Sequence, residues 1–198
     1  SRKPLSLAAA EQVAANLAET LSGEIGLPVR HVGVQVESGS VMLLPNEDDT
    51  RYADSSGYLR SVAVAYVDEI GPQMEIVEGE PLAEQNRDPG VMDVWMHADL
   101  AAEMGVDAGE TFQLGLNIVE PISPVRIAGL WRALNPDDPF WFSDPDQALA
   151  KALIVPKASY EQFVQPVLRA KSRYASWHIV LDDRALNPIH APAYVEGF

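Results

Sequence analysis

Histidine is the side chain best suited to acid–base or metal chemistry near neutral pH, and the sequence contains four of them. They are His31, His97, His178 and His190. None has a second histidine, or a carboxylate in a setting suited to a metal site, three or four residues away. Asp99 lies two residues after His97, but that spacing is common by chance. We therefore interpret the histidines as surface or hydrogen-bonded residues and predict no metal site.

The sequence lacks the patterns that nucleophilic catalysis and nucleotide binding require. The sequence has no cysteine, which excludes thiolate nucleophiles, disulfides, cysteine-based zinc sites and iron–sulfur clusters. The segment nearest to a G-x-S-x-G serine elbow is 37–40, which lacks the first glycine and is expected in a turn. There is no G-x-x-x-x-G-K-[ST] phosphate loop, and Gly-x-Gly pairs are too sparse for a dinucleotide fold. We therefore predict no catalytic residue and no cofactor.

The segment 135–146 combines three prolines, several aspartates and three consecutive aromatic residues. Its aspartates could supply oxygen ligands to Ca²⁺, but their spacing does not match an EF-hand, so we interpret the segment as a solvated loop and leave ion binding open. These aspartates are Asp137, Asp138, Asp144 and Asp146. The aromatic residues Phe140, Trp141 and Phe142 could attach the loop to the core, close a gap between subdomains, or contact a partner or apolar ligand. We take these three as the candidate contact residues.

The composition is that of an acidic globular protein. The net charge is −15, from 14 lysine and arginine residues against 29 aspartate and glutamate residues. Affinity for nucleic acid depends on cationic side chains that neutralise phosphates, so no nucleic-acid partner is expected, and docking onto anionic lipid is opposed. We interpret the acidity mainly as a source of solubility.

The length of 198 residues suits one domain or two intimate subdomains, and a hydrophobic content of 47% indicates a packed core. The longest uninterrupted apolar run is 62–67, far short of the ~18 residues that a membrane-spanning helix needs. The chain begins at Ser1 without a methionine or a signal peptide, so we expect a processed or engineered segment.

Apolar spacing predicts three helices. The first begins at Pro4 or Ser6 and ends at Gly23, which can adopt the left-handed cap conformation. Its apolar stripe consists of Val13, Leu17 and Leu21, with Ala10 and Ala14 beside them. The other helices are expected over residues 98–104 and from Lys157 to a kink or end at Pro166.

Alternating apolar residues bounded by glycine and proline predict several short strands. In the first strand His31 and Gln35 share one face, opposite three valines. Residues 39–40 are expected to form a hairpin-like turn into a return strand, and Pro121 and Pro124 to bracket a loop. The expected strands cover residues 29–37, 41–44, 58–67, 74–77, 91–96, 111–116, 125–131, 152–155 and 174–181. Strands and helices together predict an α+β fold of mixed small sheets with packed helices.

A series of patterns follows in order between Glu78 and Trp131. An E-G-x-x-L turn precedes a strand and a small alanine-rich helix; G-x-x-x-G-[DE]-x-x-x-[LIV] and [VI]-x-[VI]-x-G come next. The four patterns occupy residues 78–82, 98–104, 105–114 and 125–129. In this order they resemble the extracytoplasmic, periplasmic core domain of MacB-like (FtsX-type) ABC transporter permeases. Local reasons also exist for the glycines, since Gly105 can close a helix and Gly109 can form a tight turn.

The resemblance implies a fold in two parts. A βαβ-type helix–strand subdomain would comprise residues 1–70 and 156–198, and a mainly-β inserted subdomain residues 71–155. The implied role is non-catalytic and extracytoplasmic: the domain engages a substrate or partner and transmits motion from ATP-driven membrane helices. The implied partners are a cytoplasmic ATPase subunit, an extracytoplasmic protein, a lipid or peptide substrate, and a second copy in a homodimer. Ser1 and Phe198 would lie near one another on one face.

Two other classes of function stay open. An independent hydrolase or metal-dependent enzyme would require a concave pocket in which histidines and carboxylates converge. A secreted ligand-binding module would require an apolar cleft lined by Phe140, Trp141 and Phe142. The segment 135–146 has no counterpart in the family pattern, so its place in the fold distinguishes these hypotheses.

Overall fold

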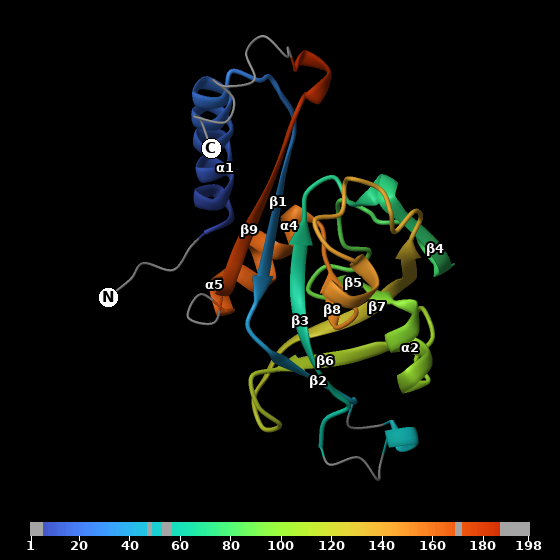
Figure 1. Cartoon of the computed structure of the whole chain (residues 1–198). Coiled ribbons are helices and arrows are strands. Elements are labelled where there is room, and N and C mark those ends of the chain that lie inside the picture. Colours follow the sequence, from blue (N-terminus) through green and yellow to red (C-terminus); the bar gives the residue numbers. More distant parts are fainter. Residues whose placement is uncertain (1–5, 47–48, 53–56, 169–171, 187–198) are drawn as a thin grey trace.

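Helices and strands are mixed along the chain, which confirms the predicted α+β class. The computed structural model describes residues 6–46, 49–52, 57–168 and 172–186 (Figure 1). The helices are α1 (Leu7–Ile25), α2 (Ala98–Met104), α3 (Pro145–Ala148), α4 (Lys157–Ser159) and α5 (Gln165–Leu168). Short 3-10 or π turns are η1 (Thr50–Tyr52), η2 (Gly71–Gln73), η3 (Tyr160–Val164) and η4 (Asp183–Ala185). The strands are β1 (Val29–Ser38), β2 (Val41–Leu44), β3 (Arg60–Val67), β4 (Met74–Gly79), β5 (Met92–His97), β6 (Thr111–Gly115), β7 (Pro121–Ala133), β8 (Ala152–Ile154) and β9 (Ser172–Leu181).

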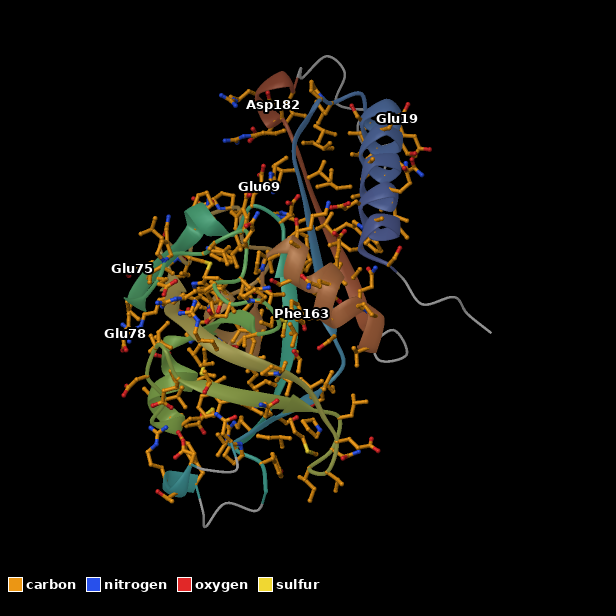
Figure 2. All side chains as sticks on the ribbon, turned by 180° about the vertical axis from the view of Figure 1, so that it is seen from behind. Glu19, Glu69, Glu75, Glu78, Phe163 and Asp182 are labelled. Carbon is orange, nitrogen blue, oxygen red and sulfur yellow. The ribbon has the colours of Figure 1, made fainter. Side chains whose placement is uncertain are left out.

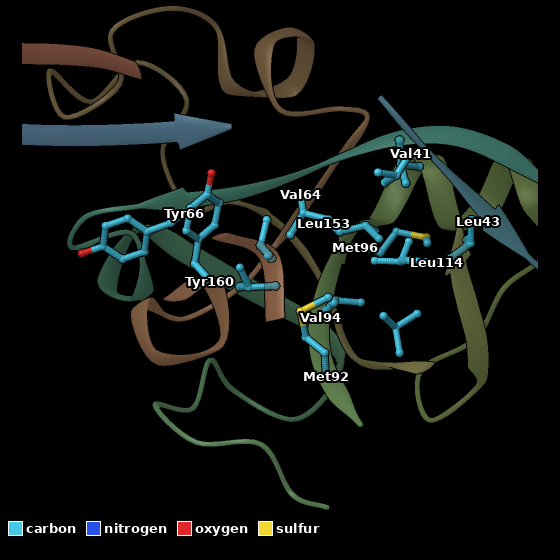
Figure 3. Close-up of a cluster of buried hydrophobic side chains, with 14 of the residues drawn as sticks. Val41, Leu43, Val64, Tyr66, Met92, Val94, Met96, Leu114, Leu153 and Tyr160 are labelled. Atoms are coloured by element: carbon cyan, nitrogen blue, oxygen red, sulfur yellow. The ribbon is translucent and has the colours of Figure 1, made fainter. Parts of the chain in front are cut away.

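The strands form one nine-stranded sheet, and most of it closes on itself. Its order is β2-β6-β7-β5-β8-β3-β1-β9, and β2 also pairs with β3. Following the pairs from β2 through β6, β7, β5, β8 and β3 returns to β2, so these strands form a closed barrel. Each of them contributes to one buried cluster, the barrel core shown in Figure 3. Its members include Leu43, Val64, Val94, Met96, Leu114, Ile127 and Leu153.

Strand β5 is buried along its whole length, which explains why its sequence alternates only weakly. Val94 and Met96 belong to the barrel core. Trp95 points to the opposite side and joins a second cluster with Trp131 and Leu149 outside the barrel. A strand covered on both faces needs no polar alternation, so its sequence resembles a continuous apolar run.

Helix α1 begins where the sequence predicts and ends later. Ser6 Oγ accepts a hydrogen bond from the Ala9 N–H at 3.1 Å, which is the expected N-cap. The predicted end at Gly23 is wrong, because Gly26 adopts the left-handed cap conformation with φ 75°. The predicted stripe is confirmed at Ala10 and Ala14, which are buried, and wrong at Leu17, which is 38% exposed, so the buried face is displaced toward the alanines. The buried face of α1 carries Leu7, Ala10, Ala14 and Ala18, small residues for the most part, so the helix lies close to the strands beneath it.

Strands β1 and β2 are one strand interrupted by a bulge, so the predicted hairpin turn at residues 39–40 is wrong. β1 pairs antiparallel with the C-terminal half of β3, and β2 pairs antiparallel with the N-terminal half of β3. The chain therefore continues in one direction from β1 into β2. Ser38 Oγ accepts a hydrogen bond from the Val64 N–H at 2.9 Å and donates to the Gly39 carbonyl at 2.7 Å. A serine hydroxyl that replaces a ladder bond lets the strand bend without reversing.

Strand β7 begins at Pro121, so the predicted loop between Pro121 and Pro124 is wrong. In this part β7 pairs with β6 alone, because its pairing with β5 starts at Val125. Proline has no N–H to donate, and a strand with one free side tolerates it.

The helix that starts at Lys157 is irregular, as the proline in it predicts. Between α4 and α5 it widens into a π turn over residues 160–164, directly before Pro166. Pro166 lacks the N–H that a regular α-helix would use at this point, and a π turn changes the hydrogen-bond spacing ahead of it.

Elements from opposite ends of the chain pack together beside the barrel (Figure 1). β1 pairs antiparallel with β9, and we call these two strands the ribbon. Helix α1 lies along the ribbon. The division into residues 1–70 with 156–198 and residues 71–155 stays a prediction. The predicted proximity of Ser1 and Phe198 falls outside the described residues.

No helix in the described part of the chain has both the length and the apolar character that crossing a membrane requires.

Candidate functional site

The two faces of the ribbon have different surroundings. On one face Val34 and Val36 are buried, and the Trp177 indole N–H donates a hydrogen bond to the Ala10 carbonyl of α1 at 2.8 Å. The opposite face carries His31 and Gln35, as the alternation in the sequence predicts, and His178 from β9. Helix α1 therefore covers one side of the ribbon and leaves the histidine side to another element.

The aromatic loop, residues 135–146, covers the histidine side of the ribbon. Phe140 and Trp141 are half-buried and pack against the cluster outside the barrel. The Phe140 N–H donates to Asp138 Oδ1 at 2.8 Å, and the Trp141 indole N–H donates to the Asn135 carbonyl at 3.0 Å. Phe142 is 77% exposed. Two of the candidate contact residues thus hold the loop in place, and the third is presented to solvent.

Aromatic rings form a continuous chain from the surface to the barrel. Phe142 lies 5.8 Å from His178 between ring centroids, His178 lies 6.2 Å from His31, and His31 lies 5.9 Å from Phe140. The chain continues from Phe140 to Trp141 at 4.9 Å, from Trp141 to Trp131 at 6.4 Å, and from Trp131 to His97 at 5.2 Å. Separations of this size are typical of attractive edge-to-face and offset stacking. The aromatic loop therefore connects the ribbon to the barrel.

His97 anchors the far end of this chain. It is 1% exposed, and its Nδ1 accepts a hydrogen bond from the Asp99 N–H at 3.3 Å, so it acts as the N-cap of α2. This bond leaves the proton of the neutral ring on Nε2, which donates to Asp146 Oδ1 at 3.0 Å. No local pattern in the sequence indicates this pair, because the two residues are 49 positions apart. Asp99 contributes its backbone to His97, and its carboxylate lies 3.7 Å from Arg132.

The structure brings together His31 and His178, and it places His97 elsewhere. His190 lies outside the described residues. Glu69 Oε2 lies 3.6 Å from His31 Nδ1, and neither His31 nor His178 is hydrogen-bonded to a serine within the described part of the chain. Among the residues that the structure describes, no group of three or more histidine, aspartate or glutamate side chains could hold a metal ion.

Three of the four aspartates considered as Ca²⁺ ligands have other partners, and Asp137 is bonded through its backbone N–H to Asn135 Oδ1 at 3.3 Å. Asp138 accepts from the Phe140 N–H, Asp144 accepts from the Asp146 N–H at 3.0 Å and from the Gln147 amide at 2.7 Å, and Asp146 pairs with His97. These bonds shape and anchor the aromatic loop.

A cleft of about 40 Å³ lies between the ribbon and the aromatic loop, and its lining includes His31, Gln35, Phe140, Phe142 and His178. That volume holds little more than a water molecule, so the cleft alone does not enclose a ligand. It adjoins a wider groove of about 610 Å³, which shares the rings of His31 and Phe140. Arg30, Glu69 and Asp138 supply the charged side chains of the groove. Its volume is in the range of sites for small molecules.

Glu78 and Gly79 lie in strand β4 and pair with Leu130 and Gly129 of β7, so the turn predicted at these residues is wrong. This end of β4, with Glu80 after it, is the scaffold centre of the patterned window. Glu78 Oε1 accepts a hydrogen bond from the Ala108 N–H at 3.0 Å, which fixes the turn after α2. Gly79 has φ 85°, and a Cβ built on it would lie 2.8 Å from the Gly129 Cα. The Glu80 carbonyl accepts from the Trp95 indole N–H at 2.8 Å. The patterns at residues 105–114 and 125–129 therefore both contact the pattern at residues 78–82 here.

A buried ion pair lies beside this end of β4. Arg126 Nε donates to Asp93 Oδ1 at 2.7 Å, and the two side chains are 9% and 3% exposed. Arg126 Nη1 also donates to Glu80 Oε1 at 2.9 Å, and Asp93 Oδ2 accepts from the Arg87 N–H at 2.6 Å. The hydrogen bonds that Arg126 donates to Asp93 and then to Glu80 raise the pKa of Arg126, so its charge is retained. Buried charges need partners of this kind, because their desolvation is otherwise uncompensated.

The pKa of Glu80 predicts a specific acid sensitivity. Hydrogen bonds from Arg126 lower the pKa of the Glu80 carboxyl below its usual 4.5. A carboxyl whose pKa is lowered by folding contributes stability that is fully present above the unfolded pKa and is lost as the pH falls through the folded pKa. We expect the difference in the free energy of unfolding between the parent and Glu80→Gln to stay constant from pH 7 to about pH 5 and to shrink below about pH 4.5. Urea denaturation at each pH measures it, with the exposed Glu75→Gln as the control; a difference that persists unchanged to pH 3 contradicts the assignment.

The chain is similar to solved structures at low sequence identity. No family model matches the chain, and no curated protein matches it. One similar solved structure is the periplasmic region of MacB from Actinobacillus actinomycetemcomitans, with 16% identity and a TM-score of 0.48 over 92% of this chain and 71% of that one. Another is a domain of a protein described as a permease from Porphyromonas gingivalis, with 14% identity and a TM-score of 0.43 over 91% of this chain and 68% of that one.

Proposed function

We propose that this chain is the extracytoplasmic domain of an ABC transporter permease, in which it binds a substrate or partner and transmits motion without making or breaking bonds. The observation that carries the proposal is the role of the patterned window from residue 78 to residue 129. The end of β4, the segment around Ala108 and strand β7 contact one another around Glu80 and Arg126. The residues that resemble the family are therefore scaffold residues, as a force-transmitting domain requires.

The ribbon is the element proposed to carry the motion. Helix α1, β1 and β9 pack together, so membrane helices placed before α1 and after β9 in a permease would both act on this unit. The chain of rings from Phe142 to His97 then links the ribbon, through the aromatic loop, to the barrel. Closely packed side chains transmit displacement because interiors are dense and little compressible.

The partners proposed for this domain are a cytoplasmic ATPase subunit, reached through the membrane helices, and a substrate or protein outside the cytoplasm. Phe140, Trp141 and Phe142 are the proposed contact residues, and Phe142 presents the exposed ring. A homodimer of the complete permease belongs to the same proposal. A secreted ligand-binding module is the second candidate function, because the cleft and groove beside these rings would serve a protein without membrane helices equally well.

The absence of cysteine from this chain permits a direct test of its location. Glu75→Cys on the exposed face of β4, in the full-length gene product with any other cysteines replaced by serine, provides a single labelling site. We expect a membrane-impermeant maleimide to label this residue in intact cells as fully as after lysis, and the labelled protein to sediment with the membranes.

Met96→Cys serves as the matched control, because Met96 is fully buried and a cysteine there reacts only when the domain is unfolded. Labelling of Glu75→Cys that requires lysis would contradict an extracytoplasmic location. Labelling in intact cells of a protein that stays out of the membrane fraction would favour the secreted module instead.

A further inference from the structure

We propose that the groove beside the aromatic cleft binds an organic cation, namely an ammonium or guanidinium group carried on an apolar body. This inference rests on the proposed function for its setting outside the cytoplasm, and it deepens that function by naming the class of ligand. The aromatic rings would hold the apolar body, and the carboxylates of the groove would hold the charge.

Aromatic rings form one wall of the groove. The rings of His31 and Phe140 line both the cleft and the groove, and Phe142 and His178 extend the wall within the cleft. Phe142 is 77% exposed although it stands next to a half-buried Phe140. Aromatic faces attract cations through the ring quadrupole as well as apolar groups through burial.

Negative charge predominates among the side chains of the groove. Glu69 and Asp138 line it, and Asp68 lines the adjoining cleft. Arg30 is the one lysine or arginine among the groove residues. Hydrogen bonds from Arg184 lower the pKa of Asp182, and the charge of Arg30 adds a smaller effect in the same direction. Carboxylates therefore outnumber cations at the site, in a protein whose net charge is −15. A cation is favoured there, and an anion is repelled.

The backbone of Glu69 points in the same direction. It is the non-glycine residue with positive φ among the described residues, at 53°, and its side chain is 70% exposed beside His31. A left-handed conformation strains every residue with a Cβ, so glycine would suit this turn better. A strained glutamate that projects its carboxylate over a groove indicates a role for the side chain rather than for the fold.

A groove with an aromatic wall and carboxylates at its rim matches a protonated amine more closely than a neutral or anionic ligand.

The test uses the 198-residue chain and three probes with the same ring: benzylammonium, benzyl alcohol and benzoate. Isothermal titration calorimetry gives the affinities, and tryptophan fluorescence reports occupancy because Trp141 lines the cleft. We expect benzylammonium to bind about tenfold more tightly than benzyl alcohol and benzoate to bind least. Equal affinity for benzylammonium and benzyl alcohol overturns the proposal.

Three variants locate the site. Glu69→Gln should weaken benzylammonium binding about tenfold and leave benzyl alcohol binding unchanged. Glu75→Gln, at another exposed glutamate that does not line the groove, should change neither (Figure 2 labels both residues). Phe142→Ala should weaken both probes. Equal losses in Glu69→Gln and Glu75→Gln would mean that net charge alone attracts the cation, and the proposal would fail.

Glu69→Gly separates function from folding. It removes the same carboxylate and relieves the backbone strain, so the thermal midpoint should be unchanged or raised by ~2–4 °C while benzylammonium affinity falls as in Glu69→Gln. A lowered midpoint together with full retention of affinity would show that Glu69 serves the fold.

The source of the cation is distinguished with a peptide. If acetyl-Phe-Lys amide binds at least tenfold more tightly than both benzylammonium and the neutral norleucine analogue, the result supports a lysine side chain of a polypeptide as the cation. Equal or weaker binding supports a free amine. Both results retain the organic cation. The calorimetry concerns the isolated chain and the maleimide labelling concerns the location of the full-length protein, so the two proposals can fail separately.

Discussion

Replacing Arg126 with methionine is expected to lower the free energy of unfolding by about 3–5 kcal/mol. The substitution keeps a long side chain but removes the partner of Asp93, whose carboxylate is 3% exposed and would be left with the Arg87 N–H alone. A buried charge without its partner retains its desolvation cost and loses its compensation. Urea denaturation at pH 7, followed by circular dichroism, measures the change.

Arg132→Met provides the matched control on the same strand. Arg132 is 57% exposed, and its carboxylate partner lies 3.7 Å away, so its loss should cost less than about 1 kcal/mol. The double variant Asp93→Leu/Arg126→Met should recover most of the loss, because it removes both charges together. If the two single arginine variants are equally stable, the buried pair does not hold the window together and the scaffold argument fails.

Replacing Gly79 with alanine is expected to cost about 3 kcal/mol or more. Gly79 has φ 85°, which disfavours any side chain, and its Cβ would lie 2.8 Å from both the Gly129 Cα and the Ala108 Cβ and closer still to the Ala128 carbonyl oxygen. These neighbours are backbone or rigidly held atoms, so β4 would have to move away from β7. Thermal and urea unfolding of the variant test this expectation.

Gly90→Ala isolates the contribution of the backbone conformation. Gly90 has φ 87°, nearly the same as Gly79, but nothing lies within 4 Å of a Cβ built on it. Its substitution should cost about 1–2 kcal/mol, the penalty for a left-handed residue with a Cβ. The excess in Gly79→Ala measures the close approach of the end of β4 to β7; no excess would show that the E-G-x-x-L segment is replaceable as a scaffold element.

Local patterns predicted the elements that depend on neighbouring residues. Ser6 caps α1 because its hydroxyl reaches a backbone N–H three residues on, and Gly105 ends α2 because it is free to adopt the left-handed conformation. Alternation correctly placed His31 and Gln35 on one face of β1. These features involve contacts within a few residues, so the sequence contains the information directly.

The same reasoning failed where distant partners decide the outcome. Residues 39–40 look like a hairpin turn, but β3 pairs with both flanking segments and keeps them in line. The predicted stripe on α1 is displaced because the ribbon selects the face with Ala10, Ala14 and Ala18, which permits close packing. Rules based on residue spacing consider one helix or strand at a time. They carry no information about the shape of the neighbouring element against which that helix or strand packs.

The candidate site divides in the same way. Its aromatic residues were evident from the sequence, because three adjacent rings in a proline-rich loop need burial or a partner. The pairing of His97 with Asp146, and the meeting of His31 with His178 and Phe140, join residues that are far apart in the chain. Neither has a local signature.

The sequence by itself determined the α+β composition, the acidic surface, the absence of thiol chemistry and the scaffold turns of the window from Glu78 to Trp131. The tertiary structure alone decided that the strands close into a barrel, that both ends of the chain supply one ribbon, and that an aromatic loop lies on it beside a carboxylate-lined groove. The physical reason is range: propensity, capping and charge act over a few residues or as sums over the whole chain. Strand closure and the grouping of side chains depend on which distant surfaces bury each other best.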